Sequence, residues 1–498
     1  MKKILLITIL IHCTLSFVHC QTTLPRDVAN EFGNLLVYHN NRICPLQTLA
    51  RDYTIKLTGK TSYKEFTAEQ VLTGWFFYYN EWRNEPMIKI KGKDVQHTLN
   101  IKDKYASFND FYTTKGYKLI GSQGKNFSAA DEKYNLIIMN LTGSLLKIFP
   151  YQTQDETKNS SLTWFALNDN LPSNMPQAEQ LFIRKSMNLI AEYIANAEYT
   201  EAVGLIRKIR VYQDTQLSTY APSKTHISAE RIYNHLNFNR PLSMALMTIG
   251  ILLYIITIIT NKTPQWSWLI LSITAIYLLF AISLRGYIAG HFPLSNGFET
   301  MQFLSLIASL IPFLNLLFSR TRKIRKDSQL NNSSFLIPNS TLICGIALMV
   351  ATMSELNPRI TLLMPVLQSP LLSIHVMVIM ISYALFALIS LNAIVNLIKR
   401  KTDTQFSTLT FALFLLTAGI FIGAIWANVS WGRYWGWDPK EVWALITMLI
   451  YSIPLHRASI KIFQNPRFLN WYYCLAFLSV IITYFGVNFI LGGLHSYA

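Results

Sequence analysis

The chain has 498 residues, of which 51% are hydrophobic and only 14% are charged. A soluble protein carries about a quarter charged residues, so an ordinary soluble fold is excluded for the chain as a whole. The net charge of +17 does not indicate nucleic-acid binding, because much of the basic excess lies in short loops between apolar runs. The five cysteines include no C-x-x-C spacing, which excludes a disulfide framework and a covalent heme-attachment motif.

The first 20 residues have the pattern of a secretory signal peptide. Met1-Lys2-Lys3 form a basic start, and an apolar run from Ile4 to Val18 follows. We predict cleavage after Cys20, with an uncleaved anchor helix as the alternative. In either case the chain from residue 21 onward is exported.

Residues 21–240 predict an exported soluble domain of the α+β class. Ile88–Leu99 and Asn135–Ile148 contain alternating or β-branched runs that favour strands, whereas Gln177–His235 shows the spacing of two or three amphipathic helices. The domain has no recognisable catalytic constellation. Its isolated histidines are interpreted as surface or satisfied side chains: His39, His97, His226 and His235.

Residues 241–498 predict an all-α polytopic membrane domain. Eight apolar runs are each of a length that suits a membrane-spanning helix, the structure that satisfies the backbone in lipid. The predicted spans are Leu242–Thr260, Trp268–Leu284, Phe298–Phe318, Phe335–Met353, Leu371–Ile398, Leu409–Trp426, Glu441–Leu455 and Leu469–Leu491.

The charges of the loops predict the orientation. Lys and Arg concentrate after the third, fifth and seventh runs, within 320–326, 399–401 and 457–467. Basic loops stay in the cytoplasm, so the soluble domain, the intervening loops and the C-terminus face outward. For a bacterial cytoplasmic (inner) membrane, that side is the periplasm.

The outward loop between the sixth and seventh runs is rich in tryptophan and in charged residues. Five of the eleven tryptophans fall between residues 426 and 443: Trp426, Trp431, Trp435, Trp437 and Trp443. An interfacial aromatic belt is the alternative interpretation. The interleaved glycines and charged residues instead favour a platform for a flat ligand. Asp438, followed by Pro439 and by Glu441 three residues on, also predicts a capping box that starts the seventh span.

The sequence from Trp431 to Ala444 resembles the tryptophan-rich WWD signature of heme-handling proteins. Its Asp-Pro-Lys-Glu continuation is similar to the System II cytochrome c biogenesis protein of the CcsA/ResC family. The stretches His291–Glu299, Pro365–His375 and Leu455–Arg457 agree with that family. The resemblance covers most of residues 241–498, which look like the C-terminal part of a fused CcsB–CcsA cytochrome c synthase.

The resemblance implies roles for individual residues. Heme b would be held non-covalently on the outer side by two axial ligands, His375 and His495, against the tryptophan platform and Asp438. Arg433, Lys440 and Arg285 are candidates for the heme propionates, with ordinary interface charges as the equal alternative. His291 is a weaker candidate in an outward loop, and Glu299 is expected to cap a helix or to pair with a basic residue.

His456 lies at the opposite end of the seventh span, so one iron cannot be shared with the outer pair across a core about 30 Å thick. It would serve a separate inner heme site, with its second ligand supplied by a CcsB/ResB-like membrane subunit. The alternatives are an inner site that works differently and a simple interfacial anchor beside Arg457.

The family resemblance implies a cytochrome c heme lyase component. Heme would be presented for thioether attachment to the Cys-x-x-Cys-His segment of apocytochrome c, kept reduced by separate thiol-reducing proteins. No catalytic acid or base and no other metal site stands out in the sequence. A heme exporter or heme-binding carrier without synthase activity is the alternative, since the same residues serve both functions.

Overall fold

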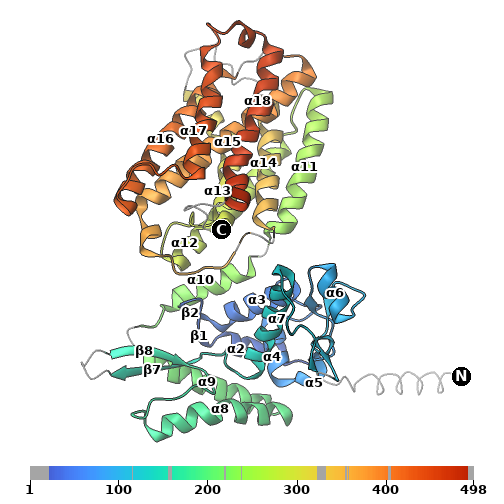
Figure 1. Cartoon of the computed structure of the whole chain (residues 1–498), viewed down its shortest axis with the longest axis vertical. Coiled ribbons are helices and arrows are strands. Elements are labelled where there is room, and N and C mark those ends of the chain that lie inside the picture. Colours follow the sequence, from blue (N-terminus) through green and yellow to red (C-terminus); the bar gives the residue numbers. More distant parts are fainter. Residues whose placement is uncertain are drawn as a thin grey trace, which may run out of the picture. The chain divides into compact units, whose positions relative to one another are not determined.

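The computed structural model describes residues 22–114, 116–154, 160–217, 220–236, 238–321, 333–353, 356, 358–401 and 405–491. The predicted signal peptide and His495 lie outside the described residues. The chain divides into two compact units, Met1–His235 and Leu236–Ala498 (Figure 1). They are called the N-terminal unit and the membrane unit below.

The N-terminal unit combines helices with short antiparallel strand pairs. The strands pair as β1 (Leu36–His39) with β2 (Arg42–Pro45), β3 (Ile88–Lys89) with β4 (Tyr105–Ala106), β5 (Tyr112–Thr113) with β6 (Gly116–Tyr117), and β7 (Phe149–Gln154) with β8 (Ser160–Phe165). The helices are α2 (Arg26–Gly33), α3 (Leu46–Thr58), α4 (Ala68–Phe77), α5 (Tyr79–Trp82), α6 (Lys93–Leu99), the 3₁₀ turn η1 (Asn109–Phe111), α7 (Lys125–Leu141), α8 (Gln177–Ala195), α9 (Tyr199–Leu217) and α10 (Lys224–His235).

The helices predicted over 177–235 are confirmed as α8, α9 and α10. The strand prediction for Asn135–Ile148 is wrong, because α7 runs through to Leu141, and only Ile88–Lys89 of the other stretch is a strand. In α7 the buried side chains of Ala130, Ile137 and Asn140 recur at helical spacing. Asn140 also donates to the carbonyl of Leu72 at 3.0 Å. A short apolar run does not by itself show whether a segment is a strand or one face of a helix. In this segment, packing against α4 favours the helix.

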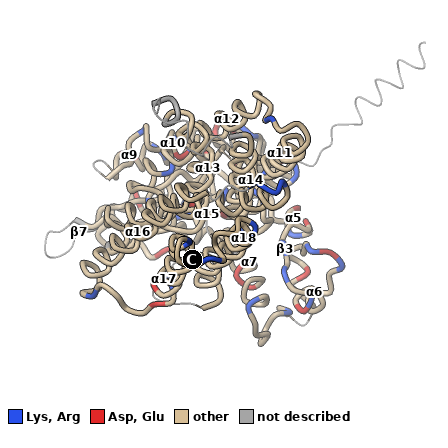
Figure 2. The backbone as a smooth tube through the Cα atoms, turned by 90° about the horizontal axis from the view of Figure 1, so that it is seen from above, with Lys and Arg blue, Asp and Glu red and all other residues tan. Residues whose placement is uncertain are grey.

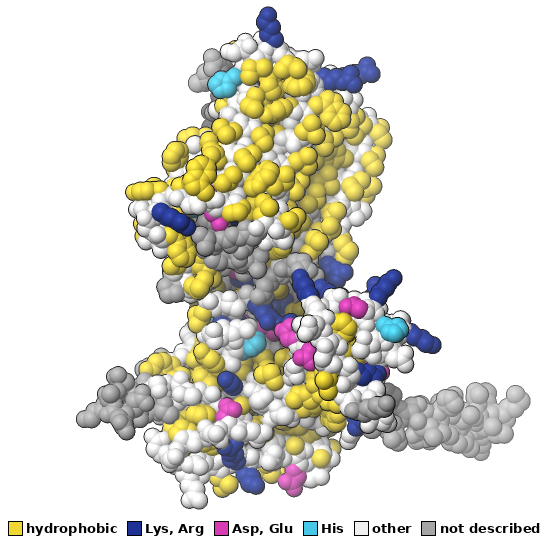
Figure 3. All heavy atoms as spheres, viewed as in Figure 1, with side chains coloured by type: hydrophobic (Ala, Val, Ile, Leu, Met, Phe, Trp, Pro, Cys, Tyr) yellow, Lys and Arg dark blue, Asp and Glu magenta, His cyan; other side chains and the backbone are white. Residues whose placement is uncertain are grey.

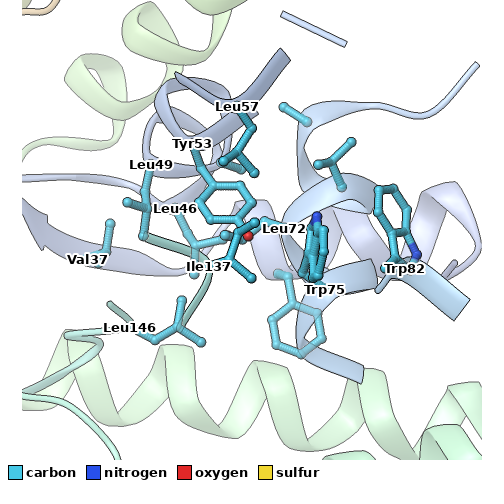
Figure 4. Packing of buried hydrophobic residues seen from close by; sticks show 14 of the residues in the cluster. Val37, Leu46, Leu49, Tyr53, Leu57, Leu72, Trp75, Trp82, Ile137 and Leu146 are labelled. Carbon is cyan, nitrogen blue, oxygen red and sulfur yellow. The ribbon is translucent and has the colours of Figure 1, made fainter. Parts of the chain in front are cut away.

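The N-terminal unit has a hydrophobic core of its own. Tyr53 of α3 lies among labelled leucines and Ile137 in Figure 4, and it is 1% exposed. Trp75 packs against Trp82 with ring centroids 6.1 Å apart. Burial of such large side chains is the main favourable term in folding, so this unit carries its own stabilising core.

All regular secondary structure in the described part of the membrane unit is helical. Its helices are α11 (Asn239–Thr260), α12 (Trp266–Ala289), α13 (Gly297–Thr321), α14 (Leu336–Ala351), α15 (Pro370–Lys399), α16 (Phe406–Trp431), α17 (Pro439–Ser452), α18 (Pro466–Ile481) and a π-helix, η7 (Ile482–Leu491), that continues α18. Four 3₁₀ turns accompany them: η3 (Ser333–Phe335), η4 (Pro365–Gln368), η5 (Ile453–His456) and η6 (Lys461–Gln464). Each of the eight predicted runs coincides with one of the eight helices α11 to α18.

Six of these helices are long and apolar enough to cross a membrane, whereas α14 and α17 are shorter. The outward side chains support a lipid environment, since Ile259, Leu269 and Ile276 are each more than 60% exposed. Hydrophobic side chains dominate the face of this unit seen in Figure 3. In Figure 2, the tubes of α13, α15 and α16 are tan over most of their visible length. The chain is a multi-pass membrane protein.

Candidate functional site

A cavity of about 200 Å³ lies in the membrane unit at the start of three helices. The first turn of α13 contributes Gly297 and Thr300, α15 contributes His375, and α17 contributes Lys440. The other lining residues come from the segments before α13 and α15, from the second half of α16 and the loop that follows it, and from η7. The cavity therefore joins residues that are almost 200 positions apart in the sequence.

The tryptophan-rich loop forms one wall, and its fold follows from local capping. Helix α16 ends at Trp431, and Gly432 continues with a φ of 72°, which glycine adopts at no steric cost. The predicted capping box is confirmed: Asp438 caps α17, and its Oδ1 accepts from the backbone N–H of Lys440 at 3.0 Å. Glu441 Oε2 accepts from the N–H groups of Gly436 at 2.8 Å and Asp438 at 3.2 Å. These bonds fold the loop back over the start of α17.

The five tryptophans lie in different surroundings. Among the described residues, Trp426 and Trp435 line the cavity, whereas Trp431, Trp437 and Trp443 are absent from its lining. Trp426 is 2% exposed, and Trp437 is 73% exposed. Trp437 stands edge-to-face with Trp435, with ring centroids 6.0 Å apart, and takes a φ of 57°, uncommon for a bulky residue.

His375 enters the cavity from the second turn of α15. Its Nδ1 lies 2.7 Å from the carbonyl oxygen of Gly419 in α16. Because a carbonyl oxygen only accepts, Nδ1 carries the proton of the neutral ring, and the lone pair is on Nε2. This is the arrangement in which a histidine ligates a metal through Nε2, with the opposite nitrogen held by a hydrogen bond. His495, its predicted counterpart, lies outside the described residues.

The predicted propionate residues are in three different environments. Lys440 lines the cavity, and its Nζ donates to Asn488 Oδ1 of η7 at 3.1 Å. Arg433 is exposed in the tryptophan-rich loop, close to Gly436. Arg285 is fully buried and is absent from the described lining. Of these three residues, only Lys440 is in the described lining of the cavity.

Arg285 instead forms a buried ion pair with Glu299. Arg285 Nε donates to Glu299 Oε1 at 2.7 Å, and its two terminal nitrogens donate to the carbonyls of Pro358 and Arg359 at 2.7 and 3.1 Å. Glu299 Oε2 accepts from the N–H and hydroxyl groups of Ser295, each at 2.7 Å. The pairing expected for Glu299 is confirmed. It ties α12 to the start of α13 and to the loop before α15.

This site lies within the region shared with known proteins. The chain is 30% identical to the cytochrome c biogenesis protein CcsA of Guillardia theta over 306 residues, which cover 52% of the chain and 96% of that protein. The chain belongs to the CcsA family of cytochrome c biogenesis proteins. It is 35% identical to CcsA of Chlamydomonas reinhardtii over 46% of the chain and 67% of that protein.

The family model described as "Cytochrome C assembly protein" matches residues 294–495, and every residue that lines the cavity falls in this range. The N-terminal unit is shared with another relative. The chain is 30% identical to Protein NrfI of Wolinella succinogenes over 95% of the chain, and it spans 55% of the length of NrfI. The CcsA-family resemblance predicted from the sequence is confirmed, and the chain functions in cytochrome c biogenesis.

Two further histidines of this CcsA-family chain lie away from the cavity lining. His456 is exposed at the end of η5, at the opposite end of α17 from the Asp438 cap. His291 lies in the loop between α12 and α13, where its Nδ1 is 3.1 Å from the carbonyl of its neighbour Phe292. The structure therefore brings His375, Trp426, Trp435, Asp438 and Lys440 to one end of the unit and leaves His456 at the other.

The polar side chains that α13 and η7 contribute to the cavity wall were not predicted from the sequence. Thr300 and Tyr484 share a hydroxyl–hydroxyl contact of 2.7 Å at the cavity wall, and Asn488 holds Lys440. Polar residues within an apolar span could have predicted this wall, because placing such groups in lipid costs free energy and they mark functional paths. Tyr484 and Asn488 lie in a π-helix, a rare form that is frequent at functional sites, which strengthens that signal.

Proposed function

We propose that the membrane unit holds heme b at this cavity and presents it to apocytochrome c, as a cytochrome c heme lyase component. The observation that carries the proposal is the joint placement of His375, Trp426, Trp435 and Lys440 around one cavity in a CcsA-family chain. An imidazole ligand, flat aromatic walls and a cation suit an iron porphyrin with two carboxylates.

The size of the cavity favours presentation over storage. At about 200 Å³ it is smaller than the roughly 300–1,000 Å³ of typical small-molecule pockets. We therefore expect part of the heme to project from it toward the exposed side chains of Tyr434 and Trp437. A projecting edge is what a protein substrate needs to reach the vinyl groups.

Of the two proposed axial heme ligands, only His375 is among the described residues. His375 would ligate iron through Nε2, and His495 is proposed as the second axial ligand from the family resemblance. Lys440 and Arg433 are proposed as propionate partners. Arg285 does not fit that role, because each of its three guanidinium nitrogens already donates within the protein.

The reaction needs little acid–base help from the protein. Each cysteine thiol of the Cys-x-x-Cys-His segment adds across one vinyl group, so that sulfur bonds to one vinyl carbon and hydrogen to the other. No net oxidation occurs in this addition. The chain's own residues orient the heme, exclude water and hold the reacting groups near each other.

The substrate thiols must reach the site reduced, and none of the described cysteines (Cys44, Cys344 and Cys474) lines the cavity. In the N-terminal unit Cys44 is 1% exposed, and burial raises the pKa of its thiol. We propose that separate thiol-reducing proteins keep the apocytochrome reduced, and that a CcsB/ResB-like membrane subunit completes the assembly.

Thioether formation is the experiment that tests this function. The chain is purified with and without a CcsB/ResB-like partner, its absorption spectrum is recorded, and reduced apocytochrome c is added. A heme lyase component yields heme that stays with the cytochrome polypeptide after acid extraction. Bound heme that is always extractable would favour the alternative, a heme exporter or carrier.

We propose that all eight helices cross the membrane, with the cavity on the outer side of a bacterial cytoplasmic membrane. Helix α17 with η5 reaches about 29 Å, and α14 with η3 about 30 Å, at about 1.5 Å per α-helical and about 2.0 Å per 3₁₀ residue. Helices α13, α15 and α17 all begin at the cavity and run toward the basic segments. By the positive-inside rule the cavity end is outside, with the exported N-terminal unit.

An even number of crossings from an exported unit predicts an outer C-terminus. A reporter enzyme that works only outside the cytoplasm, fused after Ala498, should be active. The same reporter inserted after Gln464, in the basic segment between α17 and α18, is the matched control and should be inactive. The reverse pattern would overturn the proposed sidedness.

His456 is proposed as an inner heme ligand that acts before the outer site. His456→Ala should therefore lower the heme content of the purified protein without changing the spectral type of the heme that remains. Heme content per mole of protein and the reduced spectrum measure the two quantities. Unchanged loading and unchanged holocytochrome yield would instead identify His456 as an interfacial anchor beside Arg457.

A further inference from the structure

Two glycines of α16 face α15, one helical turn apart. A Cβ added at Gly419 would lie 2.6 Å from Cδ1 of Ile379, and one added at Gly423 would lie 2.6 Å from Cε1 and 2.7 Å from Nδ1 of His375. Real Cβ atoms do not approach other atoms so closely. The His375 ring therefore occupies the space that any other residue at position 423 would fill.

The absence of a side chain at Gly423 also exposes the carbonyl oxygen that accepts from His375. In an α-helix, side chains tilt toward the N-terminus and cover the preceding turn. A side chain at position 423 would thus lie over the carbonyl of residue 419, which is the oxygen 2.7 Å from His375 Nδ1. Gly423 provides both the space for the ring and the access to its acceptor.

We propose that Gly423 and the backbone carbonyl of Gly419 are positioning elements for His375. They fix the plane of the imidazole and its tautomer, so that Nε2 is the ligating nitrogen. This inference rests on the proposed role of His375 as a heme ligand. It gives Gly423 a specific function. Without the His375 contact, Gly423 would be interpreted only as a small residue that lets two transmembrane helices pack closely.

The direct test is Gly423→Ala in the full chain. The new methyl group displaces the ring and removes its hydrogen bond, so heme bound per mole of protein should fall on the order of tenfold, as when other residues that hold metal ligands are changed. The sharp reduced bands of bis-imidazole iron should weaken in parallel.

Gly250→Ala is the matched control for tight helix packing. A Cβ at Gly250 would lie 2.8 Å from Cδ2 and Cγ of Leu342, in the contact of α11 with α14. Both variants are expected to lose membrane abundance through packing alone. Only Gly423→Ala should lose heme per molecule, and an equal loss in Gly250→Ala would overturn the inference.

A second arm removes the clash itself. In His375→Ala the ring is absent, so Gly423→Ala can be added without steric conflict. Added imidazole should restore heme binding to His375→Ala but not to His375→Ala/Gly423→Ala, because the methyl group fills part of the vacated space. Equal rescue of both would overturn the inference alone, whereas normal heme binding by His375→Ala would overturn the proposed ligand role and the inference with it.

Discussion

Replacing His375 by alanine is expected to abolish holocytochrome formation and to remove or weaken bound heme. His375 is the described imidazole at the cavity wall, and the loss of one axial ligand leaves iron with an open position. His495→Ala is expected to have a similar effect if both histidines ligate the same iron. Heme content, the reduced absorption spectrum and holocytochrome yield measure the loss.

Added imidazole should restore part of both heme binding and synthesis in the two alanine variants, because it fits the vacated space and supplies the same donor atom. Substitution by a bulkier residue should not be rescued. His291→Ala is the matched control, since His291 lies on the same side of the unit but outside the described lining, and it should behave as wild type. Normal maturation by His495→Ala would show that His495 is a surface histidine.

Breaking the buried pair between Arg285 and Glu299 is expected to cost about 3–5 kcal/mol of unfolding free energy. The two side chains are 0% and 3% exposed, so removing one partner leaves the other charge without water or a counterion. Arg285→Met and Glu299→Met should each show this loss. Unfolding of the detergent-solubilised protein by denaturant, compared with wild type, measures it.

The double variant Arg285→Met/Glu299→Met separates charge pairing from packing. Its loss should be smaller than the sum of the two single losses, because no unpaired charge remains. A control is the exposed pair between Arg207 and Glu31, with side chains 67% and 25% exposed, where Glu31→Gln should cost at most about 1 kcal/mol. Single losses of that small size at Arg285 or Glu299 would contradict the buried-pair interpretation.

The helices of the membrane unit could be predicted because lipid leaves the backbone no alternative: each apolar run must satisfy its own N–H and C=O groups. The Asp438 capping box could be predicted because all its atoms lie within four residues of one another. The strand predicted over 135–148 failed because its outcome depended on a distant partner, the carbonyl of Leu72.

The site was harder to predict for the same reason. Residue type suggested a tryptophan platform, but the loop conformation decides that Trp426 is buried at the cavity and that Trp437 is exposed. Arg285 has the charge of a propionate partner, yet Glu299, fourteen positions later, binds it. Tyr484 and Asn488 contribute to the wall only because η7 returns the chain to the cavity.

Because η7 lies at the cavity, its residues are the last of the described lining to be synthesised. Membrane helices are made from the N-terminus onward, and folding follows that direction. A nascent chain that has reached Ser452 already contains His375 and the five tryptophans of the loop, but it lacks the wall of Thr483, Tyr484 and Asn488. Lys440 then has no Asn488 to hold its amine. The cavity is completed by the last described helix, so a ribosome-bound or truncated chain does not yet offer a finished site to a reactive iron porphyrin.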